Sequence, residues 1–270
     1  MRLALPQIVL AGGLLLTLQA PLAAQIDYRN LDDDRPLVTE DAYAVERHAF
    51  EFLLPYAFAA ERGGERLHAF IPELEYGIIP NGQLGIKAPI GGRREAGGTD
   101  WGLAGLRIFG LYNLNTESRT LPALSARADI VLPVGGLAGE ATRVGLKAIA
   151  TRSWGRTRFH ANAAWTFGDA QRLAAVEPGN RWSYSVAVDR TLFRQSTLLI
   201  GELVALRPIR GAPVEVDAAL GARYQWTTTT VFDVGVRRRL REVAGPDIAI
   251  TVGFSHAFAL PWLMPRGARR

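Results

Sequence analysis

The feature of the sequence that most constrains its fold is the alternation of apolar and other side chains with a period of two. The alternation is clear from residue 48 to 58, where the even positions carry His48, Phe50, Phe52, Leu54, Tyr56 and Phe58. Because successive side chains of a strand point to opposite faces, this pattern predicts a β-strand with one apolar face. Similar segments recur to Phe258, at roughly 46–59, 65–78, 84–91, 100–114, 119–132, 142–154, 157–168, 181–190, 196–207, 213–226, 229–240 and 247–258.

Soluble β-sandwiches also alternate, and three further features favour a membrane barrel. The apolar face holds five or six positions in a strand, close to the ~9–11 residues with which a tilted strand crosses a bilayer. The other face carries charges, which a barrel would enclose in a polar lumen. Aromatic residues lie near strand ends, as in the girdles of membrane barrels: Trp101, Trp165, Trp182 and Tyr184 at one rim, Trp154, Tyr224 and Trp226 at the other. The sequence thus predicts an all-β fold, a single antiparallel transmembrane β-barrel of about 12 strands in a bacterial outer membrane.

The alternation also predicts which side chains line the interior, namely those at the positions of each strand that alternate with the apolar ones; we call this the inward parity. Glu202 shares this parity, and the residues that we expect to line a pore are Glu73, Glu75, Lys87, Arg107, Arg127, Asp129, Arg143, Lys147, Arg158, His160, Asp189, Asp217, Arg223, Asp233 and Arg237. These charges either form a selectivity surface for a polar or anionic solute or a network of ion pairs that fills a closed interior. Both interpretations stay open, because a barrel of twelve strands lies between filled small barrels and open porins.

Connection lengths predict the orientation. An even number of strands places both termini on one side, which we assign to the periplasm. The tight connections 80–83, 155–156 and 227–228 then lie on that side, and the longer connections 92–99, 133–141, 168–180 and 241–246 lie outside. Short periplasmic turns and long outer loops are typical of such barrels.

The two ends of the chain fall outside the barrel, which we place at residues 45–259. Residues 1–24 resemble a secretory signal peptide, with Arg2, an apolar stretch from Ile8 to Leu18 and small residues before Gln25. Residues 25–44 form a polar arm, which either plugs the lumen or remains solvated. Residues 260–270 form a basic tail beyond Phe258, and 251–258 resemble the signal that barrel-assembly machinery reads.

Composition excludes several function classes. The net charge of +5 is too small to indicate nucleic-acid binding. The absence of Cys excludes disulfides and thiol chemistry. The four His lack the spacing of a metal site, so no metal or cofactor is expected.

Three short motifs resemble a family of bacterial outer-membrane "transporters" named for a putative MetA pathway of phenol degradation. They are Arg-Pro-Leu-Val-Thr-Glu-Asp-Ala at 35–42, the hairpin at 75–86, and the strand at 121–136 with its Leu-Pro-x-Gly end. The resemblance spans most of 35–258, and the basic tail departs from it. It implies an outer-membrane barrel, and no enzyme, for the passive uptake of small, hydrophobic or aromatic molecules.

Other candidate sites give alternatives to transport. The pair Glu73 and Glu75 could share a proton or bind a cation, or could instead pair with Arg47 or Arg107. Ser183, Ser185 and His160 are the residues closest to a hydrolase site, and a membrane-embedded hydrolase or lipid-modifying enzyme is one alternative function. A closed structural barrel is another. Arg237, Arg238 and Arg239 could bind lipopolysaccharide phosphates or mark the headgroup level. The expected partners are outer-membrane lipids and lipopolysaccharide, the assembly machinery and a small solute.

Overall fold

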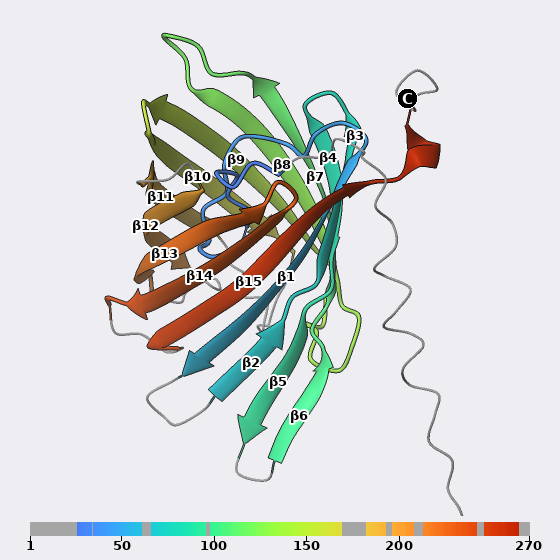
Figure 1. Ribbon diagram of the computed structural model, residues 1–270. Helices are drawn as coiled ribbons and strands as arrows, with labels where there is room; N and C mark the ends of the chain where they lie inside the picture. The colour runs from blue at the N-terminus through green and yellow to red at the C-terminus, as the bar shows by residue number, and fades with distance from the viewer. Residues whose placement is uncertain are drawn as a thin grey trace, which may run out of the picture.

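The computed structural model describes residues 26–33, 35–60, 66–95, 98–168, 182–192, 196–207, 213–241 and 246–264. Within them fifteen β-strands form one antiparallel sheet (Figure 1). The predicted signal peptide, most of the 168–180 loop and the end of the basic tail lie outside the described residues. The strands are β1 (Ala49–Ala60), β2 (Arg66–Phe70), β3 (Glu73–Ile79), β4 (Gly82–Lys87), β5 (Ile90–Glu95), β6 (Gly98–Leu103), β7 (Leu106–Asn115), β8 (Ala123–Leu132), β9 (Arg143–Trp154), β10 (Thr157–Phe167), β11 (Trp182–Thr191), β12 (Thr197–Arg207), β13 (Glu215–Thr227), β14 (Thr230–Arg239) and β15 (Ile248–Ala259).

The sheet closes on itself because β1 pairs with β15 along its full length, from Ala49 opposite Ala259 to Ala60 opposite Ile248. Six of the fifteen strands are halves of three longer ones: β2 with β3, β4 with β5, and β6 with β7. Both β3 and β2 pair with β1, at its beginning and at its end. The described residues therefore form the predicted barrel of twelve strands.

Three interruptions lie side by side on neighbouring strands. They fall at Pro72, Pro89 and Gly105, and each is bridged by one backbone bond to the next strand, such as Ala88 N–H to Pro72 O. Proline has no N–H to donate to a ladder, and Gly105 has a φ of +119°, so the regular ladder stops at this line. Beyond it β2, β5 and β6 continue as a smaller sheet, seen in the lower part of Figure 1. The strand that the sequence predicts at 84–91 is longer in the structure, where β4 and β5 together run from Gly82 to Glu95. The added segment lacks alternation, but β5 is held by pairing with β2 on one side and β6 on the other.

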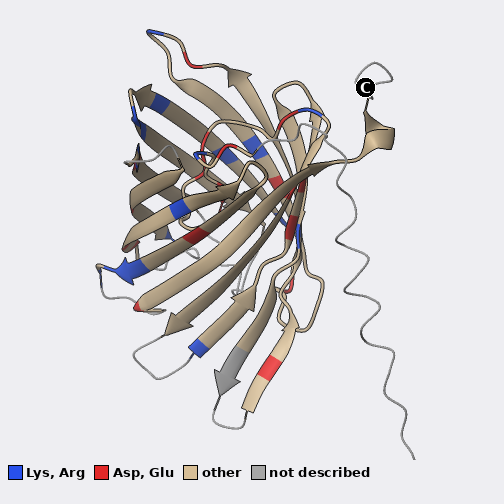
Figure 2. Ribbon diagram, in the orientation of Figure 1, with Lys and Arg blue, Asp and Glu red and all other residues tan. Residues whose placement is uncertain are grey.

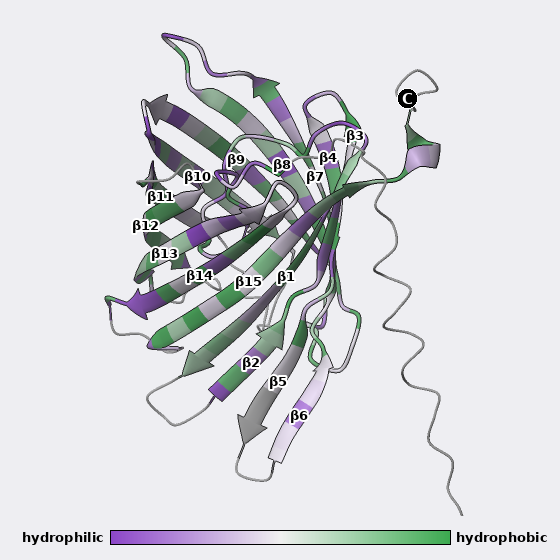
Figure 3. Cartoon of the chain, in the orientation of Figure 1, coloured by the Kyte–Doolittle hydropathy of each residue, from purple (hydrophilic) through white to green (hydrophobic). Residues whose placement is uncertain are grey.

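The surface of the barrel is apolar and its interior is polar, the reverse of a soluble protein. Val186, Leu203 and Leu220 are 55%, 51% and 72% exposed, whereas Lys87 and Asp189 are fully buried. Figure 3 shows apolar and polar residues alternating along the strands, and Figure 2 shows charges spread through the wall. This arrangement is that of a transmembrane β-barrel.

Aromatic side chains group near the ends of the strands, as predicted. Trp182 and Trp165 pack against Tyr184, with ring centroids 5.3 and 5.8 Å from it. Tyr224 and Trp226 lie 6.4 Å apart where β13 ends. The helices of the described part include none with the length and apolar composition needed to cross a bilayer. After β15 the described residues, which end at 264, make a short 3₁₀ turn, Pro261–Leu263.

Candidate functional site: the arm-filled interior of the barrel

The described part of the N-terminal arm, residues 26–33 and 35–46, lies inside the ring of strands (Figure 1). Its apolar side chains pack against the few apolar residues that point inward. Leu31 and Leu37 contact a cluster of Ala187, Leu198, Ile200 and Ala219. Ala42 is fully buried against Leu111, Ala123 and Ile149, and Ile26 packs against Val231 and Ala257. The interior is thus filled by a separate segment of the chain.

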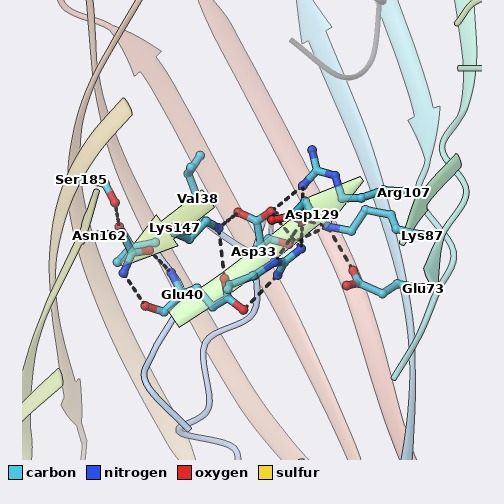
Figure 4. A network of polar contacts seen from close by, with 12 residues as sticks. Asp33, Val38, Glu40, Glu73, Lys87, Arg107, Asp129, Lys147, Asn162 and Ser185 are labelled. Atoms are coloured by element: carbon cyan, nitrogen blue, oxygen red, sulfur yellow. Dashed lines mark hydrogen bonds and ion pairs between the residues drawn. The ribbon is translucent and has the colours of Figure 1, made fainter. Parts of the chain in front are cut away.

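The arm has almost no regular structure, so polar side chains of the wall satisfy its backbone groups. Glu202 on β12 accepts hydrogen bonds from the backbone N–H groups of Val38 and Thr39 and from the Thr39 hydroxyl. Asn162 on β10 accepts from the N–H of Glu40 and donates to its carbonyl, both at 2.8 Å. These bonds fix the path of the arm across β10, β11 and β12 (Figure 4).

Further bonds of the same kind hold the rest of the arm. The N–H of Ala42 donates to the Thr151 hydroxyl at 3.0 Å, and its carbonyl accepts from Asn113 at 2.6 Å. The N–H of Val45 donates to the Gln83 side chain at 2.6 Å. Thr151 and Asn113 also bond within the wall, to His160 and Ser125, so the arm joins polar networks that the wall already forms.

A first group of charges surrounds the carboxylates of Asp33 and Glu40 (Figure 4). Asp33 lies 2.8 Å from Lys147 and 2.9 Å from Arg107, and Glu40 lies 2.9 Å from Arg127 and 3.0 Å from Lys147. Burial acts to raise the pKa of Asp33, but the charges of Lys147, Lys87, Arg127 and Arg107 hold it well below the usual range. Asp33 therefore stays ionised, and we call its cationic surroundings, Lys87, Arg107, Arg127 and Lys147, the basic cluster.

A second group is built around Arg35. Its guanidinium lies 2.6 Å from Asp32, 3.2 Å from Asp233 and 3.8 Å from Glu51. Arg35 is only 1% exposed, and although burial opposes it, these carboxylates raise the pKa of the guanidinium. Arg35 thus links the arm to β1 and β14 through buried ion pairs.

The chain passes closely over β14 at the next residue. A Cβ at Gly235 would lie 2.5 Å from the carbonyl oxygen of Pro36, so only glycine allows this approach. Gly221 on β13 faces the same proline ring, with 2.9 Å from an added Cβ to Pro36 Cγ. Both glycines therefore allow the arm to lie directly against β13 and β14.

A third group joins the arm to β10 and β11. Arg158 lies 3.1 Å from Asp41 and 2.8 Å from Asp189, and His160 bonds to Asp189 at 2.9 Å and to Thr151 at 3.0 Å. Burial raises the pKa of Asp41 to about 7, against the opposing effect of Arg158 and of backbone N–H donors. Ser185 does not join His160, since its hydroxyl bonds to the Thr39 hydroxyl at 2.8 Å instead, so the expected hydrolase residues are not brought together.

The residues expected to line a pore divide into those that contact the arm and those that do not. Ion pairs with the arm involve Lys87, Arg107, Arg127, Lys147, Arg158, Arg223 and Asp233. Asp217 pairs instead with Arg239, at 3.0 Å, and Arg237, at 3.9 Å, where β13 begins and β14 ends. Arg143 is buried where β9 begins. Glu73 pairs with Lys87 at 3.1 Å, not with the proposed Arg47 or Arg107, because Lys87 is its direct neighbour across β3 and β4.

Sequence reasoning missed the residues of the arm itself and the uncharged members of the wall. Asp33, Arg35, Glu40 and Asp41 supply the arm's ion pairs, and Gln83, Asn113, Thr151 and Asn162 hold its backbone. The inward parity of the uncharged residues was visible in the sequence. Within the described ranges, no group of three or more His, Asp or Glu is arranged to hold a metal ion.

A closed antiparallel barrel with an apolar exterior, a charged interior and an internal segment belongs to the class of outer-membrane barrels. Solved structures with this architecture are similar to the chain. The COG4313 outer membrane channel from Pseudomonas putida F1 matches with a TM-score of 0.60 at 15% identity, over 85% of this chain and 100% of that chain. The KdgM porin matches with a TM-score of 0.52 at 13% identity, over 76% and 99%. The NanC porin matches with 0.51 at 10% identity, over 77% and 98%.

At these identities the likeness shows a shared fold. No protein-family model matches the sequence, and no curated protein matches it.

Proposed function

We propose that this chain is a non-enzymatic outer-membrane channel for the passive uptake of small molecules, and that its N-terminal arm closes the lumen at rest. The observation that carries the proposal is that the interior is occupied by a segment outside the barrel strands. A twelve-stranded barrel is wider than one that its own wall side chains fill. A segment held by hydrogen bonds and ion pairs, without a covalent crosslink, is able to leave.

The charged interior supports passage of a solute once the arm has moved. Cavities of about 370 and 610 Å³ already lie beside residues 26–30 of the arm, partly lined by Glu46. The wall residues that pair with the arm would then face the lumen together with Glu73, Glu75, Asp129, Arg143, His160, Asp189, Asp217 and Arg237. These residues are the proposed pore lining.

The setting of the channel follows from the same reasoning. Both termini would lie in the periplasm, the exposed apolar belt would lie in the outer membrane, and Arg238 would lie at the level of the lipopolysaccharide phosphates. Membership in the MetA-pathway transporter family, with hydrophobic or aromatic solutes, is supported by the motifs at 35–42, 75–86 and 121–136. The KdgM porin, which is similar in fold, has been solved "in complex with disordered oligogalacturonate", and this supports a role in small-solute transport for such a barrel.

Single-channel conductance in a planar bilayer tests the proposal. Deleting residues 25–44 should convert small or absent steps into large, discrete ones, and an aromatic acid should block them. The full-length chain is the reference, and Glu215→Gln, on β13 and away from the arm, is the control for an unrelated loss of charge. A correctly folded deletion variant without steps would refute the channel and favour a closed structural barrel.

A further inference from the structure

The basic cluster collects four cationic side chains from four strands at one level of the interior. Lys87 comes from β4, Arg107 from β7, Arg127 from β8 and Lys147 from β9. Their ammonium and guanidinium groups converge on the carboxylate of Asp33, at distances between 2.8 and 3.8 Å (Figure 4). Four cations around one carboxylate form a site that recognises negative charge.

The wall by itself does not neutralise these cations. Its carboxylates within ion-pair distance are Glu73, beside Lys87, and Asp129, beside Arg127 and Arg107. Glu75 forms no ion pair with a described cation. Both ion-pair partners of Lys147 among the described residues, Asp33 and Glu40, belong to the arm. Departure of the arm would therefore leave about two positive charges uncompensated in a poorly solvated interior, which is costly unless another anion takes their place.

Apolar surface adjoins the basic cluster on two sides. The ring of Phe109 lies under the Arg127 guanidinium, 3.7 Å from its centre, and is buried. Leu111 and Ile149 are the inward residues next along β7 and β9, and Ala42 of the arm covers them. The arm thus places two carboxylates on the cations and a small apolar side chain on the neighbouring apolar patch.

We propose that the arm occupies the binding site of the transported solute, and that this solute is an amphipathic carboxylate whose anionic group takes the places of Asp33 and Glu40. Its apolar body would lie against Phe109, Leu111 and Ile149. Solute and arm compete for the same cations, so the solute itself opens the lumen. The inference rests on the proposed channel function and adds to it the charge of the solute and the reason for opening.

The competition predicts that a carboxylate exposes the arm. Because the sequence has no Cys, Leu37→Cys introduces a unique thiol at a position that is 5% exposed in the arm. In the full-length chain in lipid vesicles, benzoate should accelerate labelling of this thiol by a water-soluble maleimide, in a saturable way. Benzamide with sodium chloride at matched ionic strength is the neutral control and should have no effect.

Variants of Lys147 assign the effect to the basic cluster. In the variant that lacks residues 25–44, where no arm competes, Lys147→Met should raise the half-saturating benzoate concentration for block of conductance about tenfold to a hundredfold, because it removes a charge-assisted bond to the solute. Lys147→Arg should remain within a few-fold of the parent. Arg190→Gln, which removes an exposed cation of β11 that bonds to Thr157, should leave the value unchanged. An equal response to benzoate and benzamide, or an unchanged half-saturation in Lys147→Met, would overturn the proposed site.

Flux of both solutes into vesicles, corrected with protein-free vesicles, separates this inference from the proposed function. Saturable benzoate flux together with arm exposure supports both. If benzoate and benzamide cross equally without exposing the arm, a channel exists and the carboxylate site is refuted. If neither crosses even after deletion of residues 25–44, the channel function itself fails.

Discussion

Replacing Glu202 by Gln should release the arm without changing the barrel. The Glu202 carboxylate accepts three hydrogen bonds from the arm, from Val38 N–H, Thr39 N–H and the Thr39 hydroxyl, and is 4% exposed. The amide of Gln keeps the size of the side chain but turns one acceptor oxygen into a donor. One N–H of the arm would then face an N–H of the Gln amide, and the two remaining hydrogen bonds would have a neutral acceptor in place of a carboxylate.

The magnitude follows from these contacts. A hydrogen bond to a charged group contributes ~1.5–3 kcal/mol and a neutral one ~0.5–1.5 kcal/mol. Losing one charged bond and weakening two others sums to about 3–5 kcal/mol. A neutral amide is cheaper to bury than a carboxylate, which offsets part of this loss. We expect a net of about 2–3 kcal/mol, or a ratio of released to docked arm that rises roughly 30- to 150-fold.

The thiol introduced by Leu37→Cys reports this ratio, because its labelling rate is proportional to the released fraction. Glu202→Gln should raise the rate by that factor. Glu215→Gln is the matched control, since Glu215 pairs with Arg239 at 2.6 Å and has no described contact with the arm. Equal labelling of parent and Glu202→Gln, with both barrels folded, would show that this carboxylate does not hold the arm.

Three further predictions concern the wall and the pH dependence of the arm. Val186→Lys should lower the free energy of unfolding in lipid by ~2–4 kcal/mol, and Ala218→Lys, nearer a strand end, by less; urea titration in vesicles measures both, and no change would contradict their lipid-facing orientation. Gly235→Ala should displace Pro36 and increase labelling of the arm. A labelling rate like that of the parent would show that the close approach of Pro36 to β14 is not required. The pKa of Asp41 is raised to about 7 in the docked arm and lies near ~3.9 in a free one, so docking takes up a proton and should weaken as pH rises from ~4 to ~7. Asp41→Asn should remove this dependence of the labelling rate, and its persistence would assign it to another group.

The sequence by itself determined the barrel. Side-chain period in a strand is a local property, so alternation at positions such as 182–190 and 248–258 fixes both the strand and the face of each residue without knowledge of its neighbours. Counting these segments predicted the closed ring of twelve strands, whereas the expected strands at 65–78 and 84–91 ran through Pro72 and Pro89 without a break. The inward parity of Lys87, Lys147 and Glu202 followed in the same way.

Only the tertiary structure decided what the inward charges contact. Partners across the lumen depend on strand register, tilt and the course of the arm, all of which bring together residues far apart in sequence, such as Asp33 and Lys147. The arm carries no periodic pattern, because wall side chains and not a ladder satisfy its backbone. The sequence therefore left open whether the arm plugs the lumen or stays solvated. Whether a polar interior is an open passage or a filled one is likewise set by packing in three dimensions, and here Asp33, Glu40 and Ala42 fill it.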